Sequence, residues 1–286
     1  MLKPYIGRFA PSPSGPLHDG SLIAAMASYL DAKSHQGKWL LRIEDIDTPR
    51  VQAGADQFIM QQLQTLHMFW DGPVVWQSQR LSRYEEIFQQ LHTKHLIYGC
   101  QCNRKTLTSV PKNKWGEYPY PNTCRALSLK NARAWRLIMP DQNIVFNDRY
   151  ENRQEQNVAK EVGDIIIKRS DGLFSYQFVV VIDDIDQGIT DIVRGRDLLS
   201  STPRQILLAQ QLNHPYPHTF HTPLRCDDQG HKLSKQNHAP ALDLLNPIQT
   251  LNQAWTFLGF QPLYVTSIDD FWLQASYQWR QRFPHP

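Results

Sequence analysis

Residues 8–21 are Arg8-Phe9-Ala10-Pro11-Ser12-Pro13-Ser14-Gly15-Pro16-Leu17-His18-Asp19-Gly20-Ser21. They overlap the end of a strand-like pattern over 5–10, which the prolines interrupt. A helical pattern extends from about 21 to 36, and the apolar run 39–43 predicts a second strand. Strand, loop, helix and strand in this order are typical of a nucleotide-binding α/β domain with a right-handed crossover.

The pattern changes near residue 98. Helical patterns over 56–70 and 80–96 complete the first zone. The zone that follows has three clustered cysteines and strand-like runs at 163–169 and 174–182, and it is interpreted as an insertion.

The α/β pattern then resumes. A strand at 192–195 and a helix at 203–213 are expected, followed by a pair of short helices around 242–258 and a tail that contains Trp and Pro. The chain is therefore divided into four parts. They are the first half of the nucleotide-binding domain (1–97), the insertion (98–185), the second half of that domain (186–240) and a short helical C-terminal region (241–286).

Composition excludes several classes of protein. The chain has 286 residues, 41% of them hydrophobic and 20% charged, which argues against disorder. No apolar run approaches the length of a membrane span, and Met1-Leu2-Lys3-Pro4 does not begin a signal sequence, so a cytoplasmic location is expected. A net charge of +3 does not by itself indicate nucleic acid, and four cysteines are too few for a disulfide scaffold.

Two loops carry the chemistry of phosphate binding. The Pro/Gly loop lets backbone approach a phosphate chain, and His18 at the following helix N-terminus could stabilise charge that develops there. The second loop, His231-Lys232-Leu233-Ser234-Lys235-Gln236, places two lysines where they could hold β- and γ-phosphates. Each alone is compatible with a plain connection or a solvated turn, so the conjunction matters more than either part.

This pair of loops resembles the HIGH and KMSKS signatures of class I aminoacyl-tRNA synthetases. Residues 7–15, the segment Leu41-Arg42-Ile43-Glu44-Asp45-Ile46-Asp47 and the segment 192–195 are similar to the glutamyl-tRNA synthetase catalytic core. The segment His18-Asp19-Gly20-Ser21 keeps the first His and the Gly of HIGH but lacks the second His. The resemblance implies a Rossmann-type parallel sheet with an inserted zinc-bearing subdomain.

The chain length favours one branch of this family. Only 51 residues follow Lys235, whereas a full glutamyl-tRNA synthetase carries a helical anticodon-binding region there. The chain therefore resembles the truncated paralogues, the glutamyl-Q tRNA(Asp) synthetases. That family activates L-glutamate with ATP and transfers it to queuosine at the wobble position of tRNA(Asp). The alternatives are a short glutamyl-tRNA synthetase that charges tRNA(Glu), a HIGH-type nucleotidyltransferase and a non-catalytic tRNA-binding relic.

The resemblance implies a set of substrate contacts. Arg8 and Arg194 are suited to clamp carboxylates bidentately, and Glu44 is suited to receive the ammonium group. The residues expected around glutamate are Arg8, Phe9, Ala10, Pro11, Ser12, Glu44, Tyr176 and Arg194. Those expected at ATP are His18, Gly20, Lys232 and Lys235, with His18 and Lys235 as catalytic residues and Mg²⁺ accompanying the nucleotide. The structural alternative is that Asp45 and Asp47 pair with Arg42, and that Tyr176 belongs to the core.

The insertion contains a possible metal site. Cys100, Cys102 and Cys124 supply three thiolates, and zinc normally takes four N or S ligands. The family fills the fourth position with a tyrosine oxygen, which Tyr120 matches; Tyr118, His92 and His95 are alternatives, as is a cluster without metal. Cys226 is expected to be a buried apolar residue.

Basic and aromatic residues also gather in the insertion. Such a mixture suits phosphate contacts and base stacking by tRNA, or a solvated face. The set comprises Arg104, Lys105, Lys112, Lys114, Trp115, Arg125, Lys130 and Arg133. The expected partners are thus ATP, L-glutamate and tRNA(Asp) carrying queuosine, and a monomer is compatible with the sequence.

Overall fold

The computed structural model describes residues 4–107, 110–127, 129, 131–224 and 242–285. The predicted opening unit is confirmed. β1 (Ile6–Phe9), α1 (Asp19–Ser34) and β2 (Lys38–Ile43) follow one another, and β1 pairs with β2 in parallel. β3 (Val75–Trp76) extends this sheet beyond β2.

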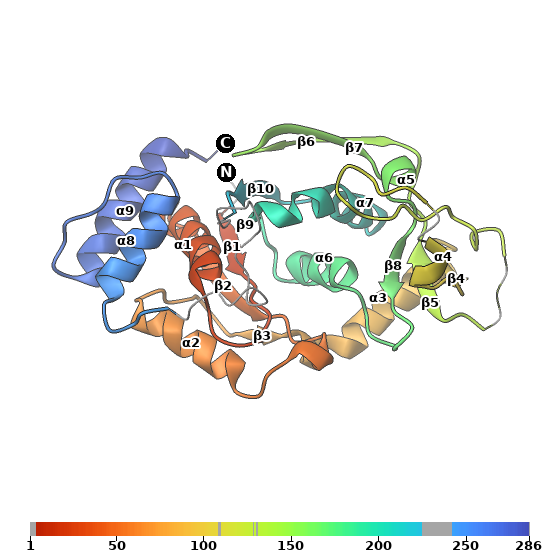
Figure 1. Cartoon of the computed structure of the whole chain (residues 1–286), viewed down its shortest axis with the longest axis horizontal. Coiled ribbons are helices and arrows are strands. Elements are labelled where there is room, and N and C mark those ends of the chain that lie inside the picture. Colours follow the sequence, from red (N-terminus) through yellow and green to blue (C-terminus); the bar gives the residue numbers. More distant parts are fainter. Residues whose placement is uncertain (1–3, 108–109, 128, 130, 225–241, 286) are drawn as a thin grey trace.

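A second sheet lies next to β1. β9 (Asp191–Gly195) and β10 (His218–Thr222) pair in parallel, and the backbone N–H of Thr190 donates to the carbonyl of Ile6 at 2.9 Å. The helix α1 packs against β1, β2 and β9. The carboxyl ends of β1, β9 and β10 therefore meet near the N-terminus of α1, which is where open α/β sheets bind ligands (Figure 1).

The hairpin of β6 (Asn143–Asp148) and β7 (Asn152–Asn157) lies within the interval assigned to the insertion. It is nevertheless attached to the catalytic sheet, in the strand order β7-β6-β10-β9. A third, antiparallel sheet consists of β4 (Ile97–Cys100), β5 (Ala134–Leu137) and β8 (Ile165–Lys168). β8 confirms the strand expected at 163–169.

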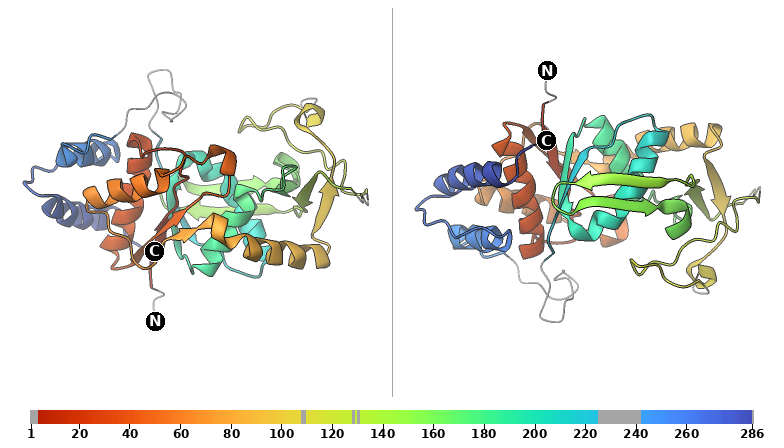
Figure 2. Two further views of the ribbon diagram at one scale, coloured as in Figure 1. Left: turned by 90° about the horizontal axis from the view of Figure 1, so that it is seen from below. Right: turned by 90° about the horizontal axis from the view of Figure 1, so that it is seen from above.

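The helices form two apolar clusters. One joins α1 to α2 (Ala55–Thr65), α8 (Pro247–Phe257) and α9 (Ile268–Arg282). The other joins α3 (Leu81–Thr93), α6 (Tyr176–Asp186) and α7 (Thr202–Gln211) to the third sheet. The described residues also form the short helices α4 (Arg104–Leu107) and α5 (Val158–Glu161) and the 3₁₀ turns Thr48–Arg50, Gln77–Arg80 and Arg196–Ser201. The C-terminal helices and the subdomain with α4 and β4 lie at opposite ends of the molecule (Figures 1 and 2).

Two expectations were wrong. The run 174–182, expected as a strand, contains the first two turns of α6. Val179, Val180, Val181 and Ile182 favour a strand by local propensity, but all four are buried in a helix that packs between neighbours, so tertiary contacts override propensity. The expected tail beyond 258 contains the 15-residue helix α9, whose buried face includes Phe271, Ala275 and Trp279.

A single buried carboxylate joins α1 to three distant segments. Asp31, fully buried in α1, accepts from the hydroxyl of Tyr5 and from the indole N–H of Trp279, at 2.5 and 2.9 Å. Arg149, in the turn between β6 and β7, donates to both oxygens of the same carboxylate, at 2.6 and 3.0 Å. The N-terminal strand region, the hairpin and α9 are thereby fixed to one point on α1.

Candidate active site

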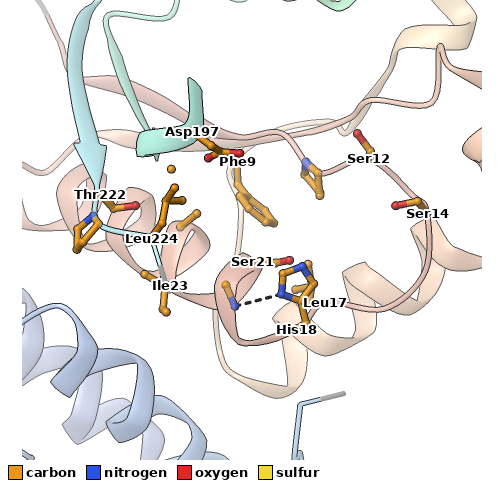
Figure 3. Close-up of a pocket in the computed structure, with 15 residues that line it drawn as sticks. Phe9, Ser12, Ser14, Leu17, His18, Ser21, Ile23, Asp197, Thr222 and Leu224 are labelled. Atoms are coloured by element: carbon orange, nitrogen blue, oxygen red, sulfur yellow. Dashed lines mark hydrogen bonds between the residues drawn. The ribbon is translucent and has the colours of Figure 1, made fainter. Parts of the chain in front are cut away.

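A cavity of about 260 Å³ opens at the carboxyl ends of β1, β9 and β10 (Figure 3). Its walls include five of the predicted site residues, Phe9, Pro11, Ser12, His18 and Gly20. Gly195, Asp197, Thr222, Pro223 and Leu224 form the opposite wall. The cavity therefore brings three residues that the sequence assigns to glutamate, Phe9, Pro11 and Ser12, together with two that it assigns to ATP, His18 and Gly20.

His18 is the N-cap of α1, as the sequence predicts. Its Nδ1 accepts a hydrogen bond from the backbone N–H of Gly20 at 3.1 Å, drawn as the dashed line in Figure 3. Because Nδ1 accepts, the proton of the neutral ring is on Nε2. The ring is therefore in the tautomer that can donate from Nε2 to a phosphate oxygen.

A buried charged cluster joins β1, β2 and α6. Arg8 donates from Nε and Nη2 to the two oxygens of Asp184, at 3.0 and 3.2 Å. Arg42, fully buried, donates from Nη1 to the same Asp184 at 2.8 Å and contacts Glu44 at 3.4 Å and Asp183 at 3.7 Å. Burial alone would raise the pKa of Asp184, but the guanidinium groups of Arg8 and Arg42 outweigh burial and lower it.

The alternative pairing of Arg42 with Asp45 and Asp47 is wrong. Asp45 accepts from the hydroxyl and backbone N–H of Ser78, and Asp47 pairs with Arg50 and Arg169. The short sequence separation suggested these partners, but the two carboxylates lie in the loop beyond the end of β2.

Glu44, which the sequence predicts as the partner of the substrate's ammonium group, belongs to the same cluster through Arg42. Burial raises the pKa of its carboxyl to about 7, although Arg42 and Arg8 oppose the increase. Its backbone N–H donates to the carbonyl of Pro11 at 2.9 Å, which fixes Glu44 against the Pro/Gly loop. A cation bound beside Glu44 would favour the ionised form.

Arg194, in β9, differs from the other two arginines. It is buried, and its guanidinium donates to His221 Nε2, Gln205 Oε1 and Thr202 Oγ1 at 2.9, 2.8 and 2.7 Å. Among the described residues, no carboxylate forms an ion pair with it. A buried cation with only neutral hydrogen-bond partners is destabilising unless an anion binds to it.

Tyr176 and Ala10 are two further residues that the sequence predicts at the glutamate substrate. Tyr176, the first residue of α6, is close enough to Arg194, Glu44 and Arg8 for all three to influence its pKa, which burial raises. Tyr176 packs at the edge of an apolar cluster rather than in a strand. Ala10 follows β1 directly and is half-buried.

Sequence reasoning missed several residues that hold these side chains. They are Asp183, Asp184, Gln205, Thr202, His221, Asp148 and Tyr216, whose hydroxyl donates to Gln205 at 2.6 Å. Two adjacent acids directly after the apolar run 178–182 were a usable signal, because buried carboxylates need partners. Lys232 and Lys235, together with Lys130 and Cys226, lie outside the described residues.

The three cysteines of the insertion come together. Their Sγ atoms lie within 4.8 Å of one another, and Cys102 and Cys124 are 3.5 Å apart. Tyr120 Oη is 3.5 Å from Cys100 Sγ and 3.9 Å from Cys102 Sγ. Sulfur ligands on one tetrahedral zinc are separated by about 3.8 Å, so these donor atoms fit a zinc ion. His92 and His95 do not join this group.

The surroundings of Cys124 and Cys100 favour thiolates, whereas burial raises the pKa of Cys102. Burial would raise the pKa of Cys124, but the backbone N–H of Gln101 and neighbouring side chains lower it to about 7. Arg136, buried in β5, donates to Cys100 Sγ at 3.3 Å, and its guanidinium lies 3.4 Å from the centre of the Tyr120 ring. A cation at this position balances negative charge on the sulfur ligands.

The basic residues of the insertion are divided between internal and surface roles. Arg125 pairs with the buried Asp164 at 2.8 Å, so it serves the fold. Lys112 and Lys114 lie over the rings of Tyr118 and Trp115, and both aromatic side chains are exposed. These two cation–aromatic pairs give the insertion a surface on which bases could stack.

The geometry agrees with what comparison with known proteins shows. Residues 6–244 match the family model of the class I tRNA synthetases (E and Q), catalytic domain. The fold is similar to that of a glutamate tRNA ligase from Elizabethkingia meningosepticum solved with its amino acid, with a TM-score of 0.71 and 29% identity. That comparison covers 82% of this chain and 52% of the ligase, so the chain spans about half the length of this solved relative.

Curated relatives narrow the assignment. A protein of Bordetella bronchiseptica named glutamyl-Q tRNA(Asp) synthetase is 51% identical, with 98% of this chain and 90% of that protein covered. A protein of the same name from Janthinobacterium is 50% identical, with 99% of each covered. The chain belongs to the class I tRNA synthetase family and, within it, to the glutamyl-Q tRNA(Asp) synthetases; it is a ligase. In the described part of the chain, no helix has the length and apolarity of a membrane span.

Glu44 provides a test of the pKa argument. In the unfolded chain its carboxyl titrates near 4.5, and in the fold near 7, so the native state binds more protons between these values. Stability should therefore fall as the pH rises through this interval. We expect Glu44→Gln to raise Tm by roughly 2 to 6 °C at pH 8 and by less at pH 5.

The control for this measurement is Glu155→Gln in β7, because the Glu155 side chain is exposed. It should change Tm little at either pH. Equal gains in Tm for Glu44→Gln at pH 5 and pH 8 would contradict the raised pKa.

Proposed function

We propose that the chain activates L-glutamate with ATP to form glutamyl-adenylate and transfers the glutamate to queuosine at the wobble position of tRNA(Asp). The observation that carries this proposal is the buried guanidinium of Arg194, which has only neutral hydrogen-bond partners among the described residues. Tyr176 is close enough to both Arg194 and Glu44 for each to influence its pKa. A cation beside an acid and a hydroxyl is complementary to an amino acid with a second carboxylate. The names of the close relatives support the same substrates.

The proposed glutamate site assigns different tasks to the two arginines. Asp184 already occupies Nε and Nη2 of Arg8, so Arg8 contributes through its remaining Nη1 edge. Arg194 supplies the main contact to the side-chain carboxylate, Glu44 receives the ammonium, and the hydroxyl of Tyr176 completes the pocket. Phe9, Pro11 and Ser12, which line the cavity, and Ala10, which follows β1, complete the wall of the proposed glutamate site.

The first chemical step requires no covalent bond to the protein. The α-carboxylate of glutamate attacks the α-phosphorus of ATP, and the bond to the β-phosphate breaks to release pyrophosphate. Negative charge increases on the departing phosphates. The groups that stabilise this charge are His18 Nε2–H and the N-terminus of α1. The sequence adds Lys232 and Lys235 to them. Mg²⁺ bound with ATP would share this charge.

In the second step a queuosine hydroxyl attacks the carbonyl carbon of the mixed anhydride. The new ester forms, the hydroxyl proton is lost and AMP departs. We propose that the insertion, ordered by zinc on Cys100, Cys102, Tyr120 and Cys124, contacts the tRNA away from the cavity. A cytoplasmic location and a monomeric state stay predictions.

The test is glutamate-dependent ATP–pyrophosphate exchange, followed by transfer of labelled glutamate to tRNA(Asp) with and without queuosine. We expect exchange without added tRNA and transfer only to the queuosine-containing tRNA, with the alkali-labile label in the anticodon loop. Label at the 3′ end of tRNA(Glu) would identify a conventional synthetase. Exchange that does not depend on glutamate would identify a nucleotidyltransferase.

The phosphate contacts lead to a further expected result. Lys235→Ala removes one charge-assisted contact to the nucleotide, which is worth on the order of 2 to 3 kcal/mol, or roughly 30- to 150-fold in glutamate activation. Steady-state exchange assays measure the loss. An unchanged rate would remove Lys235 from the mechanism.

A further inference from the structure

His221 connects Arg194 to a carboxylate that Arg194 does not touch. His221 lies in β10 and is fully buried. Its Nε2 is 2.9 Å from Nε of Arg194, and its Nδ1 is 2.6 Å from Oδ2 of Asp148, the last residue of β6. The order Arg194–His221–Asp148 is therefore a chain of hydrogen bonds from the candidate glutamate site to the hairpin.

The donors in this chain fix the tautomer of His221. A guanidinium nitrogen can only donate, so Nε2 of His221 must accept, and the ring proton must be on Nδ1. Nδ1–H then donates to Asp148. Burial lowers the pKa of His221, which keeps the ring neutral, and bonds from His221 and Glu151 outweigh burial to hold the pKa of Asp148 at about 2.

The two oxygens of Asp148 have different tasks. Oδ1 accepts three backbone N–H groups, from Tyr150, Glu151 and His221, at 3.1, 2.9 and 3.1 Å. Oδ2 accepts from the His221 ring. The backbone of the hairpin thus determines which oxygen faces the imidazole.

We propose that Asp148 and His221 are positioning residues that hold Arg194 for a ligand carboxylate and thereby determine the preference for glutamate over glutamine. This inference rests on the proposed function. Direct contact with a carboxylate neutralises a guanidinium, as Asp184 does for Arg8. Arg194 instead donates to Nε2 of His221, whose orientation Asp148 fixes. The negative charge of Asp148 is therefore separated from the guanidinium by the imidazole ring. The cation is left to pair with the substrate, and an amide in place of the carboxylate would not balance it.

Asp148→Asn tests the tautomer. The three backbone donors retain the amide oxygen at the Oδ1 position, so the amide NH₂ faces Nδ1 of His221. Nδ1 must then accept, and Nε2–H points at Nε–H of Arg194, donor against donor. We expect KM for glutamate to rise by about 10- to 100-fold, while KM for ATP and kcat change by less than about 3-fold. The glutamate-to-glutamine ratio in kcat/KM should fall by a similar factor.

Asp191→Asn is the matched control. Asp191 is a buried aspartate of the adjacent strand β9, and it accepts from Thr190 and His285 without touching Arg194. The same chemical change there should leave the glutamate preference intact. An equal loss of preference in both variants, or a parallel rise of KM for ATP and glutamate, would show general damage and overturn the proposal.

A second pair of variants covers the case in which Asp148→Asn does not fold. The amide oxygen of His221→Gln can accept from Nε of Arg194, whereas His221→Leu has similar size and no acceptor. We expect glutamine at 221 to retain most of the glutamate preference and leucine to lose it. Equal behaviour of the two variants would contradict the role of Nε2.

The tautomer can also be measured directly by ¹⁵N NMR of the His221 ring. Wild-type protein should show the proton on Nδ1, and Asp148→Asn should show it on Nε2. This NMR measurement does not depend on catalysis, so it tests the positioning pair separately from the proposed function. Absence of glutamate-dependent exchange in wild type would refute the proposed function, whereas a proton on Nε2 in wild type would refute the positioning pair.

Discussion

Arg194→Lys is expected to be almost as inactive as Arg194→Ala. The guanidinium distributes donors to His221, Gln205 and Thr202 from three different nitrogens, and one ammonium group cannot reach three separated acceptors. It also lacks the planar edge that binds a carboxylate with two parallel bonds. We expect kcat/KM for glutamate to fall by about 100- to 1000-fold in both variants.

Glutamate-dependent pyrophosphate exchange, with glutamate and ATP varied separately, provides the measurement. Arg153→Lys in β7 carries the same substitution at an exposed side chain and should behave as wild type. Full activity of Arg194→Lys would disprove the two-bond geometry. A loss confined to ATP would place Arg194 at the nucleotide instead.

Loss of the metal is expected to separate the two steps of the reaction. About one zinc per chain should co-purify, held by the four donor atoms of the insertion. The double variant Cys100→Ser with Cys102→Ser should lose the zinc and nearly all transfer to tRNA. Glutamate activation should fall by less than about 3-fold, because the cavity is built from other strands and the insertion would unfold locally.

Cys226→Ser is the control, since Cys226 lies outside the cluster in the sequence and should leave the zinc content unchanged. Tyr120→Phe examines the oxygen ligand alone, and we expect a lower zinc affinity than in wild type. Equal zinc affinity in Tyr120→Phe would exclude Tyr120 as a ligand. Freshly purified, chelator-free protein without zinc would exclude the metal site altogether.

The elements that the sequence predicts well are those whose signals are local. β1, α1 and β2 each have a clear period, and prolines and glycines mark the loop between them. α6 was misassigned because Val179 to Ile182 are β-branched, and only their burial on all sides explains a helix. α9 was missed because its apolar residues are spaced among Gln, Ser and Arg.

The same distinction between local and distant signals explains which residues of the candidate site could be predicted from the sequence. His18, Arg8, Glu44 and the cysteines belong to motifs or short spacings, so they could be selected from the sequence. Asp184 is 176 residues from Arg8, and Asp148 is 73 residues from His221. Such partners are brought together only by the tertiary fold, which packs α6 with Asp184 against Arg8 and places β6 with Asp148 beside β10 with His221. No local pattern indicates which acid accompanies which base.

The contacts of Asp31 have a consequence for the order of events during synthesis. α1 is among the first helices to leave the ribosome, but the partners of Asp31 include Arg149 and Trp279, and α8 and α9 supply the apolar cover of α1. Until translation has passed α9, the nascent chain therefore carries an apolar helix that lacks the cover of α8 and α9 and whose carboxylate lacks the bond from Trp279. We infer that the nucleotide-binding half matures after the insertion, against the usual N-to-C order. Ribosome-bound chains that stop before α8 should be digested rapidly within α1.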